Sequence, residues 1–393
     1  MTANELTMSP LDADMFPHLM DAIVQAAPHA ALLRLRGTSR HFRTACDTAL
    51  AHHLSIEVTD PRFREPGKRY DGFAPVCLGA RAGRVPHLRD WPYGGKLEDE
   101  ADDSDPADLD ESSTPAARLK YATASLAATR VLDIIGPVDP AYLEWLSNRI
   151  DTGRLTLRFR LNADREPGTG EGLVANTKPS PRNASPSNTA VVFTLLYPEN
   201  RRDHPVAPIG LVPDGLGITR LVINVAFDPA NPFLPIGAVD GFYYPKDIDE
   251  VVILFNARTD LPFKTPTLAK MQSISGNMRH PPGILDNVAY LLAPQLRTVR
   301  HTFVNLASVP VMAFGIDEPP QPFAPEEVYA LIAGYLKAAF LERRDDAWDG
   351  DVRFDDWPDH EIDEAIARNV QFLGLEEYRQ TLPPDEFALQ IVE

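Results

Sequence analysis

Residues 221–227 read LVINVAF and residues 251–255 read VVILF, two unbroken apolar runs rich in β-branched and aromatic side chains. Such runs are typical of parallel strands buried on both faces, because a strand with one wet face alternates apolar and polar residues. Comparable runs occupy residues 131–135, 155–161, 191–197 and 311–314. The runs recur roughly every 25–30 residues, which predicts an α/β fold whose parallel strands are joined by return segments.

Helical patterns fall between and after these runs. They cover residues 141–149, 267–275, 284–293, 325–341, 361–369 and 375–381, with one more short strand at 370–373. A strand and a return segment repeated at this spacing favour an irregular solenoid that resembles a leucine-rich repeat. A doubly wound α/β sheet gives the same coarse pattern, and no run matches the Leu-x-x-Leu-x-Leu-x-x-Asn ladder cleanly, so both architectures stay open.

The first part of the chain, residues 9–54, is predicted to form three short helices. The first carries apolar residues at helical spacing, namely Phe16, Leu19, Met20, Ile23, Val24 and Ala27. Pro28 separates it from a leucine-rich second helix, which ends at Gly37, and Thr38 or Ser39 can cap a third helix that runs to residue 54. Because so small a unit buries little apolar area, we expect it to dock onto the rest of the chain or onto another protein.

The remaining organisation follows from composition. Residues 55–128 are predicted to be a linker, within which residues 98–111 (EDEADDSDPADLDE) are expected to be disordered by like-charge repulsion. Residues 129–393 are predicted to form the repeat-like α/β domain, with a polar insert at 163–188.

Charge and cysteine content exclude several classes of function. The net charge of −18 disfavours a nucleic-acid or membrane-surface role for the whole protein, because both partners are anionic. The two cysteines, Cys46 and Cys77, are too few for a disulfide framework or a four-cysteine zinc site. With no signal-like start and no long apolar stretch, we expect a cytoplasmic or nuclear protein without cofactor or metal.

Residues 12–54, DADMFPHLMDAIVQAAPHAALLRLRGTSRHFRTACDTALAHHL, resemble an F-box. The shared features are the amphipathic first helix, the leucine-rich second helix and the Thr-Ser-Arg-x-Phe-Arg segment from Thr38 to Arg43. The likeness is closest to the divergent F-box-like segments that open many fungal proteins of otherwise variable sequence. The Leu-Pro pair usual at the start of the family is not intact, since Leu11 precedes Asp12 and the proline stands at Pro17.

The resemblance implies a non-catalytic subunit of a cullin-type ubiquitin ligase. In this family the helical unit binds a Skp-type adaptor, which hangs from the cullin scaffold, and repeats further along the chain hold a protein target. The expected adaptor-binding residues are Phe16, Pro17, Leu19, Met20, Ile23, Leu32, Leu33, Leu35, Arg36 and Phe42. The apolar members of this set could also form only the core of the helical unit.

Other features of the sequence bear on docking and on catalysis. Residues 29–54 carry Arg34, Arg36, Arg40 and Arg43 against one acid, Asp47, so they either steer toward an acidic partner or cover a solvent-exposed face. Neither a Gly-x-Ser-x-Gly elbow nor a phosphate-binding loop occurs in the chain. Two alternatives to the ligase subunit remain: an α/β enzyme with a helical cap at its N-terminal side, and a structural interaction scaffold.

Overall fold

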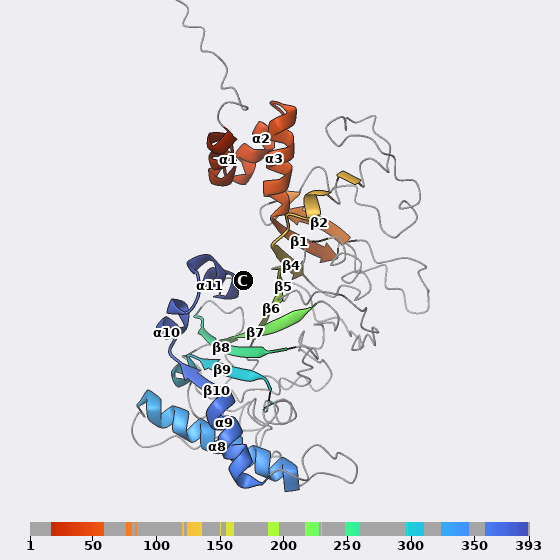
Figure 1. The fold of residues 1–393 in the computed structure, drawn as a ribbon. Coiled ribbons are helices and arrows are strands. Elements are labelled where there is room, and N and C mark those ends of the chain that lie inside the picture. The colour runs from red at the N-terminus through yellow and green to blue at the C-terminus, as the bar shows by residue number, and fades with distance from the viewer. Residues whose placement is uncertain are drawn as a thin grey trace, which may run out of the picture. The chain divides into compact units, whose positions relative to one another are not determined.

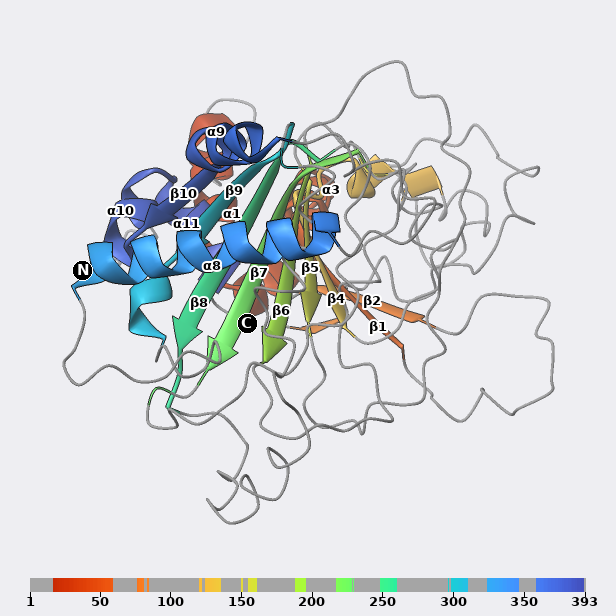
Figure 2. The ribbon, with the colours of Figure 1, turned by 90° about the horizontal axis from the view of Figure 1, so that it is seen from below.

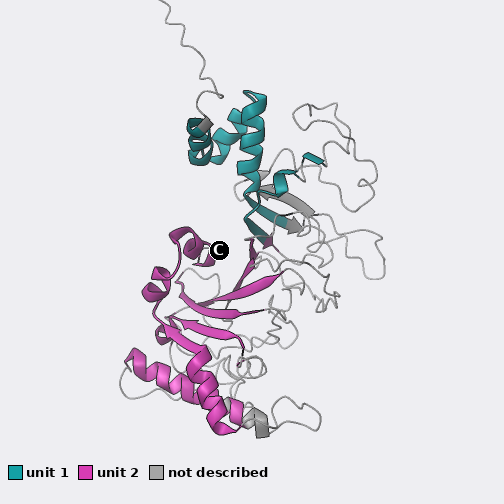
Figure 3. Cartoon of the chain, viewed as in Figure 1, with its two compact units in different colours: residues 1–133, 148–151 teal, residues 134–147, 152–393 magenta. Residues whose placement is uncertain are grey.

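A computed structural model describes the chain as two compact units. Unit 1 comprises Met1–Asp133 and Asn148–Asp151, and unit 2 comprises Ile134–Ser147 and Thr152–Glu393 (Figure 3). The structure describes residues 17–58, 76–80, 83–84, 120–121, 124–135, 150, 155–160, 188–195, 217–227, 229, 248–259, 296, 298–309, 324–345 and 358–391. The acidic stretch 98–111 and residues 163–187 of the predicted insert lie outside these ranges.

Three helices open unit 1, as the sequence predicts. They are α1 (Pro17–Ala26), α2 (His29–Arg36) and α3 (Arg40–Ala51) (Figure 1). Pro28 precedes α2 in extended conformation, and its carbonyl accepts the first helical hydrogen bonds, from Ala31 and Leu32. Ser39 caps α3, because its hydroxyl accepts a hydrogen bond from the Phe42 amide at 3.2 Å.

The third helix is shorter than predicted. It ends at Ala51, and β1 (His53–Val58) begins two residues later, so Leu54 is buried in a strand and not on a helix. β1 pairs antiparallel with β2 (Val76–Ala80), which pairs antiparallel with β3 (Gly83–Arg84). Leu54 and Ile56 alternate with the less buried Ser55, the pattern of a strand with one covered face. Residues 55–128, the predicted linker, therefore contribute strands to unit 1.

Unit 2 contains an open, parallel sheet. Its strands are β5 (Thr156–Arg160), β6 (Asn188–Leu195), β7 (Ile218–Phe227), β8 (Glu250–Ala257), β9 (Arg300–Val304) and β10 (Val370–Leu373). Each pairs in parallel with the next strand along the chain, giving the order β10-β9-β8-β7-β6-β5. The predicted α/β class is thus confirmed. Strand β4 (Val131–Ile135) matches its predicted run and is divided between the two units.

The differences from the predicted strands are local. β6 begins at Asn188, the last residue of the predicted insert, and β9 was not predicted. The missed strand contains the polar residues Arg300, His301 and Thr302, which hide its apolar character. The predicted strand 311–314 and the predicted helices 141–149, 267–275 and 284–293 lie outside the described residues.

Helices cover unit 2 on both faces of the sheet. They are α8 (Pro325–Asp345), α9 (Asp359–Asn369), α10 (Leu375–Gln380) and α11 (Pro384–Ile391). On one face, Tyr329 of α8 stacks on Phe372 of β10, which stacks on Phe303 of β9. On the other face, α10 and α11 lie across the sheet from α8 (Figure 2). Their partly buried apolar residues pack against a buried core of strand residues and Tyr378. These residues are Leu375, Leu382, Phe387 and Ile391, and the strand residues of the core are Val191, Phe193, Val222, Val252, Leu254 and Val304. Among the described residues, no helix has the length and apolar content needed to cross a membrane.

Candidate protein-binding surface

Helix α1 buries some of its large apolar side chains inside unit 1 and leaves others exposed to solvent. Met20 and Val24 are buried, whereas Leu19 and Ile23 are 41% and 37% exposed. Each pair is spaced by four residues, so the two pairs form adjacent rows on the helix surface. One row packs inward, and the neighbouring row is left at the surface.

Helix α2 repeats this division over a single turn. Leu32 is buried, Leu35 is partly buried, and Leu33 is 37% exposed. Leu19, Ile23 and Leu33 are the large apolar side chains that are exposed within the described part of the chain, and all three lie in α1 and α2. We call them the exposed apolar set. Because large apolar side chains left in water are common at protein-binding sites, these three residues are the candidate docking residues of unit 1.

A buried polar cluster joins α2 to α3 within unit 1. The Asp47 carboxylate, 1% exposed, pairs with the Arg36 guanidinium at 2.6 Å and accepts a hydrogen bond from the Tyr121 hydroxyl at 2.7 Å. Burial and the hydrogen bond to Asp47 raise the pKa of Tyr121 well above its usual range. Arg36, expected at the adaptor interface, is therefore engaged in an ion pair within unit 1.

The other predicted adaptor-binding residues fall in different places. Phe16 lies outside the described residues, and Pro17 is the first residue of α1. Phe42 is partly buried in the first turn of α3, with its ring edge-on to His41. The structure thus divides the predicted set into an exposed part and a part that serves the interior of the helical unit, which contains Met20, Leu32 and Arg36.

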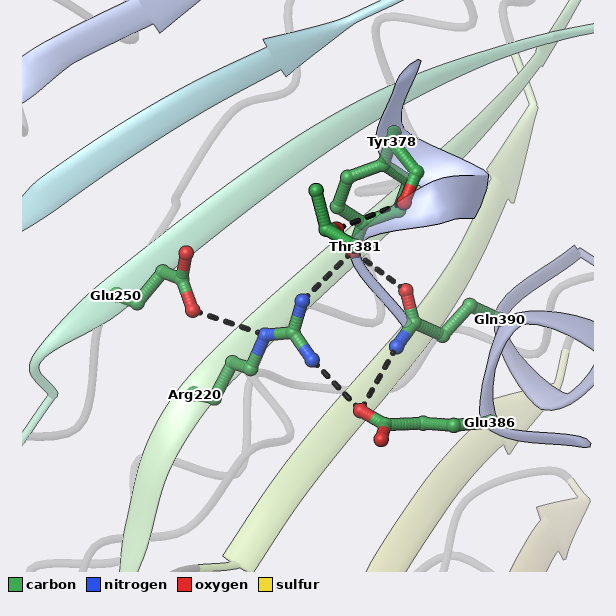
Figure 4. Close-up of polar contacts among 6 residues, drawn as sticks. All are labelled: Arg220, Glu250, Tyr378, Thr381, Glu386 and Gln390. Atoms are coloured by element: carbon green, nitrogen blue, oxygen red, sulfur yellow. Dashed lines mark hydrogen bonds and ion pairs between the residues drawn. The ribbon is translucent and has the colours of Figure 1, made fainter. Parts of the chain in front are cut away.

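A second polar cluster, absent from the sequence-based prediction, lies in unit 2 (Figure 4). Arg220 of β7 is its centre: it pairs with Glu250 of the neighbouring strand at 3.0 Å and with Glu386 of α11 at 2.7 Å. Its guanidinium also donates a hydrogen bond to the Tyr378 hydroxyl at 2.9 Å. That hydroxyl donates in turn to the buried side chain of Gln390 at 2.6 Å. The signal in the sequence was a charged residue within an otherwise apolar strand, ITRLVINVAF.

The charges within this cluster favour the hydrogen bonds and ion pairs that join Arg220 to Tyr378, Glu250 and Glu386. Burial raises the pKa of Tyr378 well above its usual range, with Glu250 and Glu386 acting in the same direction and Arg220 against it, so the hydroxyl stays protonated and can donate. One guanidinium serves two carboxylates, one from the sheet and one from α11. Arg220 therefore joins the start of β7 to residues 375–391, which we call the 375–391 segment.

The carboxyl ends of parallel strands are where α/β enzymes place their ligands. At these ends, the Asn305 amide donates to the carbonyl of Phe255 at 3.0 Å, and the Asn256 amide donates to the carbonyl of Ile391 at 3.5 Å. Within the described ranges, no group of three or more His, Cys, Asp or Glu side chains is arranged to hold a metal ion.

Comparison of the chain with protein-family models, with curated proteins and with solved structures finds no match.

Proposed function

We propose that this chain is a non-catalytic, F-box-like subunit that recruits a protein target to a cullin-type ubiquitin ligase. Helices α1 to α3 bind a Skp-type adaptor, and unit 2 binds the target. The proposal is supported chiefly by the exposed apolar set, Leu19, Ile23 and Leu33, on the helices whose sequence resembles an F-box. The subunit acts by raising the local concentration of the target near the ubiquitin-loaded enzyme.

The strand order of unit 2 supports a repeat-like solenoid as the target-binding part. From β5 to β10 each strand lies beside its predecessor, and the direction of addition never reverses. A doubly wound sheet reverses its strand order at a switch point, where its ligand crevice lies. A sheet that grows in one direction is instead typical of stacked strand-and-return units.

Adaptor binding tests the proposal directly. We expect the wild-type chain to bind a purified Skp-type adaptor in isothermal titration calorimetry, and the triple variant Leu19→Asp, Ile23→Asp, Leu33→Asp to bind about 100-fold more weakly. All three positions are exposed, so the variant retains the core formed by Met20, Val24 and Leu32. Far-UV circular dichroism of both proteins checks that the helices persist.

A matched control adds the same charge to the same unit. Ala22, Ala30 and Thr48 are exposed on α1, α2 and α3, and their triple replacement by Asp removes no large apolar side chain. We expect its adaptor affinity to stay within about threefold of the wild type. A folded wild-type chain without measurable adaptor binding would contradict the proposal and favour the scaffold or the enzyme. Equal binding by the two triple variants would show that the exposed apolar set is not the interface.

A further inference from the structure

Strands β7 and β8 carry three polar side chains directed at the 375–391 segment. Arg220 and Asn224 belong to β7, and Asn256 belongs to β8. In the β7–β8 register Asn224 lies opposite Leu254, two residues before Asn256, so both amides share the sheet face of Val222, Val252 and Leu254. This face therefore combines an apolar floor with hydrogen-bond donors, as surfaces that recognise peptides do.

Each of these donors is used by the 375–391 segment. The Asn224 amide donates to the main-chain carbonyl of Gln390 at 2.7 Å, and the Asn256 amide donates to that of Ile391 at 3.5 Å. Arg220 binds the Glu386 carboxylate, next to Phe387, whose ring packs against the apolar floor. Two contacts are with the main chain and two are with side chains, so the face selects for a carboxylate followed by an aromatic residue.

A smaller share of the 375–391 segment is buried than of the strands beneath it: only Tyr378 and Gln390 of the segment are buried, whereas every residue from Leu221 to Phe227 is. Its helices α10 and α11 have six and eight residues, lengths at which an isolated helix is marginal in water. Four of its apolar side chains, Leu375, Leu382, Phe387 and Ile391, are only partly buried, and Tyr378 alone joins the fully buried core of Val222, Val252 and Leu254. Regions with fewer buried contacts open at a lower free energy than the core.

We propose that the 375–391 segment is an autoinhibitory strap that occupies the target-binding face of β7 and β8 in cis. The target is a protein that presents an amphipathic helix with a carboxylate directly before an aromatic residue, the Glu386–Phe387 pattern. This rests on the proposed function, in which unit 2 holds the target. The target competes with a tethered segment, so its apparent affinity is reduced by the small fraction of molecules in which the segment is released.

The experiment uses the full chain and a fluorescein-labelled synthetic peptide of residues 375–391, followed by fluorescence anisotropy. Glu386→Arg places a cation against Arg220 and leaves the sheet face unchanged. We expect this variant to bind the peptide at least about tenfold more tightly than the wild type, because the segment is released and Arg220 becomes available. Adding Arg220→Ala to Glu386→Arg is expected to abolish that gain.

The control is Glu376→Arg, the same charge reversal at an exposed position of α10, where the partners of Glu376 among the described residues are Arg379 and Gln380 of the same helix. We expect it to bind the peptide as the wild type does. Equal peptide binding by all the variants and the wild type would overturn the proposal, as would strong binding that survives Arg220→Ala.

Hydrogen exchange of the wild-type chain provides a second readout that needs no variant. We expect the amides of α10 and α11 to exchange at least about 100-fold faster than those of β7 and β8. Equal protection of the helices and the strands would mean that the segment opens only on global unfolding, which overturns the proposal. Both measurements concern unit 2 alone, so a failure of adaptor binding refutes the proposed function without changing their outcome.

Discussion

In helices α1 and α2, Leu19, Ile23 and Leu33 each leave more than a third of their surface in water, whereas every side chain from Leu221 to Phe227 and from Val251 to Phe255 is buried. Unit 2 supplies its own cover, since α10 and α11 lie on one sheet face and Tyr329 of α8 packs on the other. Unit 1 leaves part of its apolar stripe uncovered. The contrast separates side chains that stabilise the fold from side chains available to a partner.

The largest expected effect compares one substitution in the two units. Leu254→Ala opens a cavity in the fully buried core of unit 2, and we expect it to lower the free energy of unfolding by about 3 kcal/mol. Leu33→Ala removes a side chain that is already exposed, and we expect a loss below about 0.5 kcal/mol. Urea denaturation followed by circular dichroism measures both. Similar losses at the two positions would abolish the distinction between the units.

Asp47 tests whether unit 1 depends on its polar cluster. Asp47→Ala leaves the Arg36 guanidinium and the buried Tyr121 hydroxyl without their carboxylate, and we expect a loss of about 2–3 kcal/mol. Thr48→Ala, at the next and exposed position of α3, is the control and should change the stability little. If urea denaturation gave equal midpoints for the two variants, the cluster would contribute nothing to the stability of unit 1.

His301 makes unit 2 sensitive to acid. It is fully buried in β9, and burial lowers its pKa to about 3, against the smaller opposing effect of a hydrogen bond to the backbone of Val299. As the pH falls, His301 of the unfolded chain takes up a proton near pH 6.5, whereas His301 of the folded chain does not. The free energy of unfolding is therefore unaffected by His301 above about pH 6.5 and decreases from there toward pH 3. From pH 7.5 to pH 5 this group alone should remove about 2 kcal/mol.

The matched variant for this prediction is His301→Leu, which has no titrating group at the site. We expect it to lose about 2 kcal/mol less than the wild type between the two pH values, in urea denaturation at pH 7.5 and pH 5. Other titrating groups act on both proteins alike, so the difference isolates His301. Parallel losses in the two proteins would show that the imidazole becomes protonated within the folded chain.

The smallest effect is expected at an exposed ion pair of unit 2. Lys337 of α8 and Asp363 of α9 lie 2.7 Å apart, with side chains 37% and 52% exposed. Solvent screens such pairs, so Lys337→Ala should cost no more than about 0.5 kcal/mol, and less at high salt. A loss above about 1 kcal/mol in urea denaturation would mean that this pair stabilises the contact between α8 and α9 more than an exposed pair normally does.

Local signals in the sequence were sufficient to predict helix starts and strand bounds wherever a few neighbouring residues determine the backbone conformation. A cap at Thr38 or Ser39 was predicted from their hydroxyls, and the structure has it at Ser39. The strands Val131–Ile135 and Val370–Leu373 have the predicted bounds. Helix α11 was not predicted, and two consecutive prolines, Pro383 and Pro384, stand at its start. Pro384 is in fact the first residue of α11, a position where proline is favoured because it needs no amide donor.

The candidate surface could be predicted only as a helical stripe. Helical spacing selects Leu19, Met20, Ile23 and Val24 alike, and only tertiary packing separates the exposed row from the buried one. Arg36 was expected to bind the adaptor from the resemblance to an F-box, and its ion pair with Asp47 was not predicted because Asp47 lies eleven residues away on another helix. Arg220 was recognisable as a charged residue in a mostly apolar strand, but its partner could not be predicted, since Glu386 is 166 residues further along the chain.

That separation has a consequence for biosynthesis. A ribosome adding about 5–20 residues per second needs roughly 8–33 s to reach Glu386 after Arg220 has been made. During this interval, the apolar floor of Val222, Val252 and Leu254 lacks the cover that α10 and α11 later provide. The nascent chain thus exposes an apolar, aggregation-prone surface. We expect chaperones to bind this surface until residues 375–391 have been synthesised.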